Sequence, residues 1–206
     1  MELPKTVVKA SRKSPKNMII YGPPKIGKTT VLSQLKDCLI IDLEEGSDMV
    51  DALKVKVTNL KELAEVGKAI MKDGKPYKYV AIDTISKLEE WCEAEAKTIY
   101  MQTPMGKNFE QKNPGASVLS LPNGAGYLKD KMLEKKGKEV AVKDLDLTGK
   151  IKQITCANAD AVGYIYREDD QTMISFNSMD DVTAGSRCNH LKGKTMPLTW
   201  SDIFID

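Results

Sequence analysis

A glycine-rich segment between residues 22 and 29 has the residue types and spacing of a phosphate-binding loop. It reads Gly-Pro-Pro-Lys-Ile-Gly-Lys-Thr and lies between an apolar run and a helical pattern. Glycines let the backbone curl, so that successive N–H groups surround a polyphosphate at the start of a helix. The alternative interpretation is a glycine turn with a purely structural role.

Two side chains at the end of this segment could do chemistry. Lys28 would reach the β- and γ-phosphates of ATP, and the Thr29 hydroxyl would bind Mg²⁺. We therefore predict ATP and Mg²⁺ as cofactors, with Lys28 as both a binding and a catalytic residue. The predicted nucleotide contacts are Gly22, Pro23, Pro24, Lys25, Ile26, Gly27, Lys28, Thr29 and Thr30.

A further carboxylate, Asp83, ends the apolar run that begins at Tyr79. In this position it would hold Mg²⁺ through the water shell of the ion, as a Walker-B aspartate does. Thr29 and Asp83 are therefore the predicted metal residues. The alternative is an ordinary aspartate that caps a turn at the end of a strand.

An acidic cluster follows the apolar run at residues 38–41. Asp42, Glu44 and Glu45 stand where a carboxylate could orient water against a γ-phosphate. A solvated acidic turn is the alternative.

Apolar runs alternate with helical patterns in the first hundred residues. The runs at 18–21, 38–41 and 79–83 predict buried strands. The predicted helix starts are Lys28, the capping pattern Asn59-x-x-Glu62 and the capping pattern Ser86-x-x-Glu89. This alternation predicts an α/β fold with a parallel sheet covered by helices.

The pattern changes after residue 101. Prolines and glycines predict a long loop over residues 102–126, and residues 127–150 are rich in lysine with weak periodicity. Apolar stretches at 161–166 and 172–176 predict an antiparallel hairpin near the C-terminus.

Length and composition narrow the class of protein. The 206 residues, 41% of them hydrophobic, predict a single nucleotide-binding domain over residues 17–206 after a basic arm at residues 1–16. A net charge of +2 argues against coating nucleic acid by bulk charge. The sequence has no membrane-length apolar run and no signal peptide, and its four cysteines are scattered, so we expect a cytoplasmic protein.

Taken together, these segments resemble the phage-encoded RecA-like P-loop ATPases, also described as phage AAA-type nucleotide-binding proteins. The resemblance rests on the phosphate loop, residues 42–46, residues 79–86, Gly126-Tyr127 and residues 159–164. It implies a RecA-like fold, a role in phage recombination by pairing or annealing single-stranded DNA, and a location in the host cell cytoplasm. It also implies Glu44 as the catalytic base, because a glutamate just past the second strand polarises the attacking water in RecA-type ATPases.

One departure from the family concerns its core sheet. In the sheet of RecA-type proteins, another buried strand lies between the phosphate-loop strand and the Walker-B strand. In the sequence it follows the Walker-B helix, but here no suitable apolar run lies between Leu88 and Ala159. We therefore expect one core strand to be missing. Nucleotide binding is then a firmer expectation than efficient hydrolysis.

Other classes of protein share a phosphate loop. A nucleotide-gated assembly protein would bind ATP with little turnover. A small P-loop kinase normally needs an arginine-bearing lid, and the chain has only Arg12, Arg167 and Arg187. In RecA-like assemblies of several copies, a basic residue from a neighbouring subunit can complete the site, and Arg187, Lys192 and Lys194 are candidates beside the alternative of a solvated basic turn.

Any contact with DNA must come from local lysine clusters, because the net charge is close to zero. One cluster is Lys9, Arg12, Lys13 and Lys16. The other cluster is Lys129, Lys131, Lys135, Lys136, Lys138 and Lys143. Single-stranded DNA is the predicted partner.

Overall fold

The computed structural model of the chain describes residues 3, 5–73, 77–112, 131–135, 138–142, 144–179 and 182–205. The chain divides into two compact units: residues 1–26, 130–145 and 150–206 form the first, and residues 27–129 and 146–149 form the second. The boundary between residues 26 and 27 falls inside the predicted phosphate-binding loop. The single domain over residues 17–206 stays a prediction.

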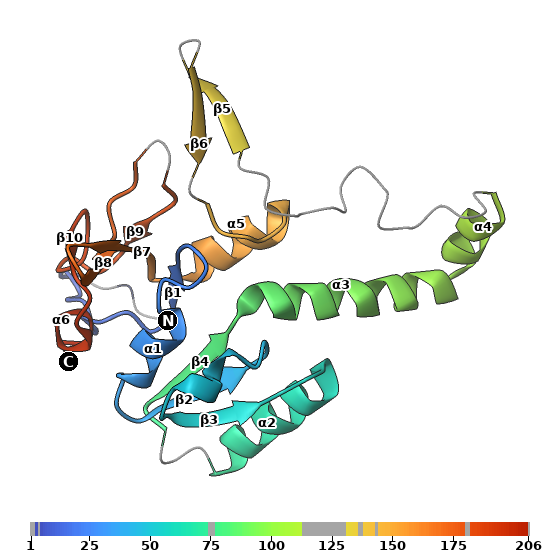
Figure 1. The fold of residues 1–206 in the computed structure, drawn as a ribbon, viewed down its shortest axis with the longest axis horizontal. Coiled ribbons are helices and arrows are strands. Elements are labelled where there is room, and N and C mark those ends of the chain that lie inside the picture. The colour runs from blue at the N-terminus through green and yellow to red at the C-terminus, as the bar shows by residue number, and fades with distance from the viewer. Residues whose placement is uncertain are drawn as a thin grey trace. The chain divides into compact units, whose positions relative to one another are not determined.

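The first unit is built on a mixed sheet (Figure 1). β1 (Met18–Tyr21) pairs in parallel with β7 (Ala161–Glu168), which pairs with β8 (Gln171–Ser175) as an antiparallel hairpin. This hairpin confirms the prediction for residues 161–176. Antiparallel β9 (Gly185–Ser186) and β10 (Thr195–Pro197) join β7 and β8, respectively.

An apolar core lies on this sheet. Ile165, Ile174 and Phe176 are almost completely buried, and Ile203 of α6 (Trp200–Ile203) packs with them. The helix α5 (Gly149–Asn158) precedes β7 in the chain. The core fixes β7, and β7 in turn holds β1 in the place from which the phosphate loop starts.

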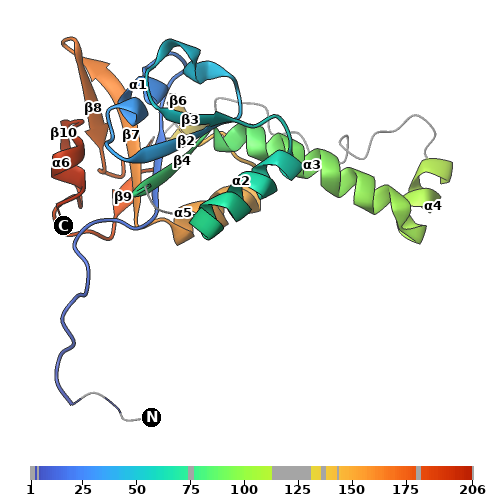
Figure 2. The ribbon, with the colours of Figure 1, turned by 90° about the horizontal axis from the view of Figure 1, so that it is seen from below.

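The N-terminal segment is extended and lies outside this core. Figure 2 shows it leading away from the strands of its unit, and the side chains of Val7 and Val8 are exposed. It becomes attached near residue 14, where Ser14 accepts a hydrogen bond from the Ile205 N–H at 2.9 Å. The Lys16 N–H then donates to the Asp160 carboxylate at 2.9 Å.

The second unit contains a parallel sheet in the order β3-β2-β4. Its strands are β2 (Cys38–Asp42), β3 (Leu53–Lys56) and β4 (Tyr79–Asp83). All five residues of β2 are buried, as expected for a central parallel strand. The register places Asp42 opposite Asp83, so the carboxyl ends of β2 and β4 are neighbours. The sequence did not predict β3.

The second unit contains four α-helices and one 3-10 turn among its described residues. They are α1 (Lys28–Ser33), the 3-10 turn η1 (Gly46–Met49), α2 (Leu60–Asp73), α3 (Ile85–Gln102) and α4 (Pro104–Lys112). Leu63, Val66 and Ile70 of α2 pack on the core of the sheet with Leu88 and Trp91 of α3. The far half of α3 extends beyond the sheet, with α4 at its end (Figures 1 and 2).

The two predicted helix caps have different outcomes. The Asn59 side chain accepts a hydrogen bond from the Glu62 N–H at 2.9 Å, which confirms the first half of the capping pattern. In the second half of a capping box, the Glu62 side chain would accept from the Asn59 N–H. Here the Glu62 carboxylate accepts from the preceding N–H, that of Thr58, at 2.8 Å. The Ser86 cap is wrong, because α3 already starts at Ile85 after Thr84 and the Glu89 carboxylate instead accepts from the Thr148 N–H.

The region after residue 101 is more regular than predicted. The loop prediction is wrong for residues 104–112, which form α4, and residues 113–126 lie outside the described part of the chain. In the lysine-rich region, β5 (Lys131–Lys135) and β6 (Lys138–Val142) pair as an antiparallel hairpin, with Lys135 opposite Lys138.

The core strand that we predicted to be missing would lie between β1 and β4 in a RecA-type sheet. Among the described strands, β1 pairs with β7 and β4 pairs with β2, in separate sheets. The mixed α/β composition and the parallel pairs fit a P-loop fold. The RecA-like strand order and the missing strand stay predictions.

Candidate nucleotide-binding site

The phosphate loop is a turn of residues 22–27 that leads directly into α1. Gly22 lies so close to β7 that a Cβ atom at this position would be 2.4 Å from the Ile165 carbonyl oxygen. Gly27 has a φ of 97°, in the left-handed region that favours glycine, and its carbonyl accepts the Val31 N–H at 2.9 Å. The two glycines of the motif therefore serve different needs, a close backbone approach and a left-handed turn.

The predicted metal residues, Thr29 and Asp83, lie in contact. The Thr29 hydroxyl donates a hydrogen bond to Oδ2 of Asp83 at 2.6 Å, although the two residues are 54 positions apart in the chain. Thr29 is in the first turn of α1, and Asp83 is the last residue of β4. This pair gives a hydroxyl and a carboxylate oxygen, the hard ligands that Mg²⁺ accepts beside water and phosphate oxygens. The residues present therefore fit the predicted ion.

Lys28 and Asp83 form the charged centre of the site. Asp83 is buried, and this burial raises the pKa of its carboxyl group, together with the nearby charges of Asp42 and Glu44, against the hydrogen bond from Thr29. Burial lowers the pKa of the Lys28 amine, although the charges of Asp83 and Glu44 act in the opposite direction. A bound cation would offset the charge of the buried carboxylate, and a bound anion would offset that of the partly buried amine. The site is therefore suited to binding both.

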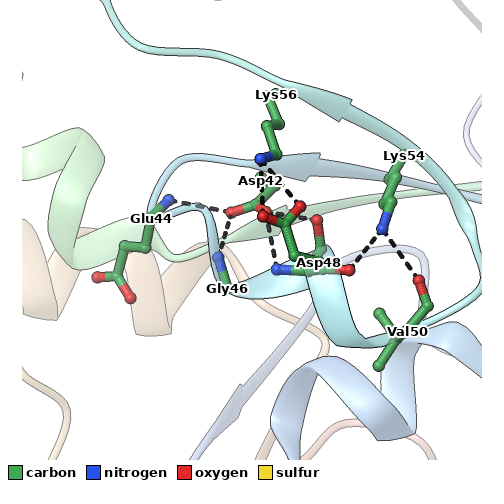
Figure 3. Close-up of polar contacts among 8 residues, drawn as sticks. Asp42, Glu44, Gly46, Asp48, Val50, Lys54 and Lys56 are labelled. Carbon is green, nitrogen blue, oxygen red and sulfur yellow. Dashed lines mark hydrogen bonds and ion pairs between the residues drawn. The ribbon is translucent and has the colours of Figure 1, made fainter.

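Asp42 holds the acidic turn together (Figure 3). One of its carboxylate oxygens accepts the N–H groups of Glu44 at 3.0 Å and Gly46 at 3.3 Å. The other accepts the N–H and the hydroxyl of Ser47. Burial alone would raise the pKa of Asp42, but these hydrogen bonds outweigh it and the pKa is lowered. Asp42 therefore shapes the turn, because each oxygen of its carboxylate accepts two hydrogen bonds from it.

Two lysines of β3 brace the same turn. Lys54 donates to the carbonyl oxygens of Ser47 and Val50, and Lys56 forms an ion pair with Asp48 at 2.9 Å (Figure 3). Glu45 has a φ of 58°, which turns the chain sharply after Glu44. The turn that begins at Glu44 is thus held by Asp42 on one strand and by the two lysines of β3 on the other.

Glu44 keeps its side chain outside the Asp42 cluster (Figure 3). Its Oε1 accepts a hydrogen bond from the Thr84 hydroxyl at 2.8 Å. Since Thr84 follows Asp83 directly, the predicted base lies beside the predicted metal residue. The sequence analysis did not single out Thr84, and the one signal for it was a hydroxyl residue next to the predicted Walker-B aspartate.

The remaining predicted contacts differ in exposure. Pro23, Pro24, Lys25 and Thr30 are exposed, whereas Ile26 is partly buried and packs against the core of the first unit. Their contacts with nucleotide stay predictions, as do the roles of Lys28 and Glu44.

Arg187 is engaged within its own chain. Its guanidinium donates to the Ala157 carbonyl and lies 3.6 Å from the Asp160 carboxylate. These contacts tie the segment after β9 to the end of α5 and to the residue before β7. Lys192 and Lys194 are exposed. A role for any of the three toward a neighbouring subunit stays a prediction.

The lysine clusters predicted to contact DNA are partly described. Lys9, Arg12, Lys13 and Lys16 are all exposed. In the second cluster, Lys131, Lys135 and Lys138 lie on the β5–β6 hairpin, and Lys129, Lys136 and Lys143 lie outside the described residues.

The described residues contain neither a cluster of metal-binding side chains nor a membrane-spanning helix. No three histidine, cysteine or acidic side chains among them gather as a metal site. A Mg²⁺ ion here would thus depend on Thr29, Asp83, water and the nucleotide phosphates. No helix in the described part of the chain has the length and apolar character to cross a membrane.

Comparison with known proteins agrees with this geometry. Residues 14–114 match the family model described as an AAA domain. The matched range contains the phosphate loop, Glu44 and Asp83, and the match supports an AAA-type P-loop ATPase that binds nucleotide. Comparisons with curated proteins and with solved structures gave no match.

Proposed function

We propose that this protein is a RecA-like ATPase that acts on single-stranded DNA in phage recombination or replication, in the cytoplasm of the host cell. The observation that carries the ATPase part is the hydrogen bond of 2.6 Å between Thr29 and Asp83, because Thr29 directly follows the phosphate-loop lysine. The DNA and phage parts rest on the family resemblance and on the exposed basic arm.

Each residue of the site has a role in this proposal. Lys28 and the loop N–H groups bind the β- and γ-phosphates, and Thr29 and Asp83 hold Mg²⁺, which neutralises phosphate charge when bound. Glu44 accepts a proton from the water whose oxygen attacks the γ-phosphorus. The bond from that phosphorus to the bridging oxygen breaks, and ADP leaves with the electron pair.

The test is ATP hydrolysis measured with and without single-stranded DNA. Glu44→Gln should retain ATP binding and lose turnover by about 10²-fold or more, the scale of a general base. Asp83→Asn should weaken the Mg²⁺ dependence. The proposal requires turnover that single-stranded DNA stimulates.

Two other results would replace the proposal. Tight ATP binding with no turnover would indicate the nucleotide-gated assembly protein. Transfer of the γ-phosphate to a metabolite instead of water would indicate a small P-loop kinase.

A further inference from the structure

We propose that Thr84 is a positioning residue, whose hydroxyl holds the Glu44 carboxylate beside Asp83 in the orientation that activates water. This inference rests on the proposed ATPase function and adds to it a residue outside the phosphate-loop, metal and base positions.

The backbone brings the two residues together. β2 and β4 are parallel neighbours, and Asp42 is opposite Asp83. Just beyond this pair, the Leu43 N–H donates to the Asp83 carbonyl oxygen at 2.8 Å. Glu44 follows Leu43 and Thr84 follows Asp83, and the hydrogen bond between the side chains of Glu44 and Thr84 continues this alignment.

The hydroxyl of Thr84 is used in an unusual way for its position. Thr84 is the N-cap residue of α3, where a threonine oxygen ordinarily accepts an N–H of the first helical turn. It makes no such hydrogen bond and donates to Oε1 of Glu44 at 2.8 Å instead. The capping role therefore does not explain this side chain, whereas a role toward Glu44 does.

Glu44 is a side chain that needs such a contact. The hydrogen bond from its N–H to Asp42 fixes its backbone, but its side chain is exposed and has several rotamers available. Within the described residues, Thr84 is the one hydrogen-bond donor to its carboxylate. That bond occupies Oε1 and leaves Oε2 to accept a proton from water.

The geometry also links the base to the metal residue. Asp83 reaches Thr29 with its side chain, and Thr84 reaches Glu44 with its own. Two adjacent residues at the end of β4 therefore set the positions of the predicted metal site and of the predicted base.

The experiment compares Thr84→Val with Thr84→Ser in steady-state ATP hydrolysis and in equilibrium ATP binding. Valine keeps the shape and removes the hydroxyl, so kcat should fall about ten- to a hundredfold with the ATP Kd unchanged. Serine keeps the hydroxyl and should retain kcat within about twofold. If the valine variant does not fold, Thr84→Ala is measured in its place.

A second measurement separates positioning from a structural role. In a Glu44→Gln background, Thr84→Val should leave the residual rate unchanged, because both substitutions act through one carboxylate. A further loss there, a normal kcat in the valine variant, or equal losses with serine and valine would overturn the inference while the ATPase function stands. Wild-type protein that does not hydrolyse ATP would overturn both.

Discussion

At the scale of single residues, the site combines carboxylates of opposite behaviour. Asp42 and Asp83 end neighbouring strands and are both buried. Asp42 accepts hydrogen bonds from the turn that follows it, whereas Asp83 faces Thr29 alone among the described hydrogen-bond donors. The first carboxylate is satisfied by the turn itself, and we propose that the second binds the metal ion.

Asp42 should make stability depend on pH in acid. Its folded pKa is lowered from 3.8, so its contribution to stability is fully present above pH 3.8 and is lost as pH falls through the folded value. The difference in unfolding free energy between wild type and Asp42→Asn should be roughly 1–3 kcal/mol at about pH 6 and smaller at about pH 3. Urea unfolding at both pH values measures it, and a difference that does not shrink in acid would contradict the role of Asp42.

At the scale of elements, the phosphate loop depends on the close approach of β1 and β7. Gly22→Ala would place Cβ at 2.4 Å from the Ile165 carbonyl, so the strand ends would have to separate. We expect a loss of about 1–3 kcal/mol in unfolding free energy, by denaturant titration, with weakened ATP binding.

The matched control is Gly67→Ala on α2. A Cβ atom there meets nothing within 4 Å, and alanine is the better helix former, so this variant should be more stable by about 0.5–1 kcal/mol. Equal stability of Gly22→Ala and wild type would show that the loop does not require this approach.

The elements that could be predicted from the sequence are those whose residue pattern favours one type of secondary structure. β1, β2 and β4 are apolar runs ending in a loop or an acidic residue, and the structure confirms them as strands. Their predicted burial holds only for β2, because β1 is partly buried and β4 exposes the side chains of Val80 and Ile82. β3 was missed because it is a short edge strand, Leu-Lys-Val-Lys, with mostly exposed residues and two charges. α4 was missed because Pro104 and Gly106 suggest a break, although proline is well tolerated in the first turn of a helix.

The site was predictable to a similar degree. The phosphate loop follows from motif spacing, and the contact of Thr29 with Asp83 agrees with the prediction that both residues hold one Mg²⁺ ion. The role of Thr84 could not be predicted, since the sequence placed the helix cap at Ser86 and a threonine beside an aspartate does not by itself identify a hydrogen-bond partner. Only the structure shows that its hydroxyl is directed to Glu44.

At the scale of the whole molecule, the charge is nearly balanced, so DNA binding must be local and sensitive to salt. Changing Lys135, Lys136 and Lys138 together to Ala should flatten the slope of log affinity against log salt by about two units, because each neutralised phosphate of a single strand contributes about 0.7. ATP binding should be unaffected. Fluorescence anisotropy of a labelled oligonucleotide over a salt series measures the slope.

The control for this triple variant is a second one, Lys61, Lys68 and Lys72 to Ala, on the exposed side of α2. It removes the same charge from a region with no predicted DNA role. Equal slopes in the two variants would place any DNA contact elsewhere, for example on the basic arm.

The central claim, that residues 22–29 bind the phosphates of ATP, is tested most directly by the ATP affinity of Lys28→Ala in the presence of Mg²⁺. Its control is Lys36→Ala, which removes an exposed lysine shortly after α1. A charge-assisted contact to phosphate is worth about 1.5–3 kcal/mol, so calorimetry should show at least a tenfold weaker Kd for Lys28→Ala and no change for Lys36→Ala. An unchanged ATP affinity in a folded Lys28→Ala protein would contradict the claim.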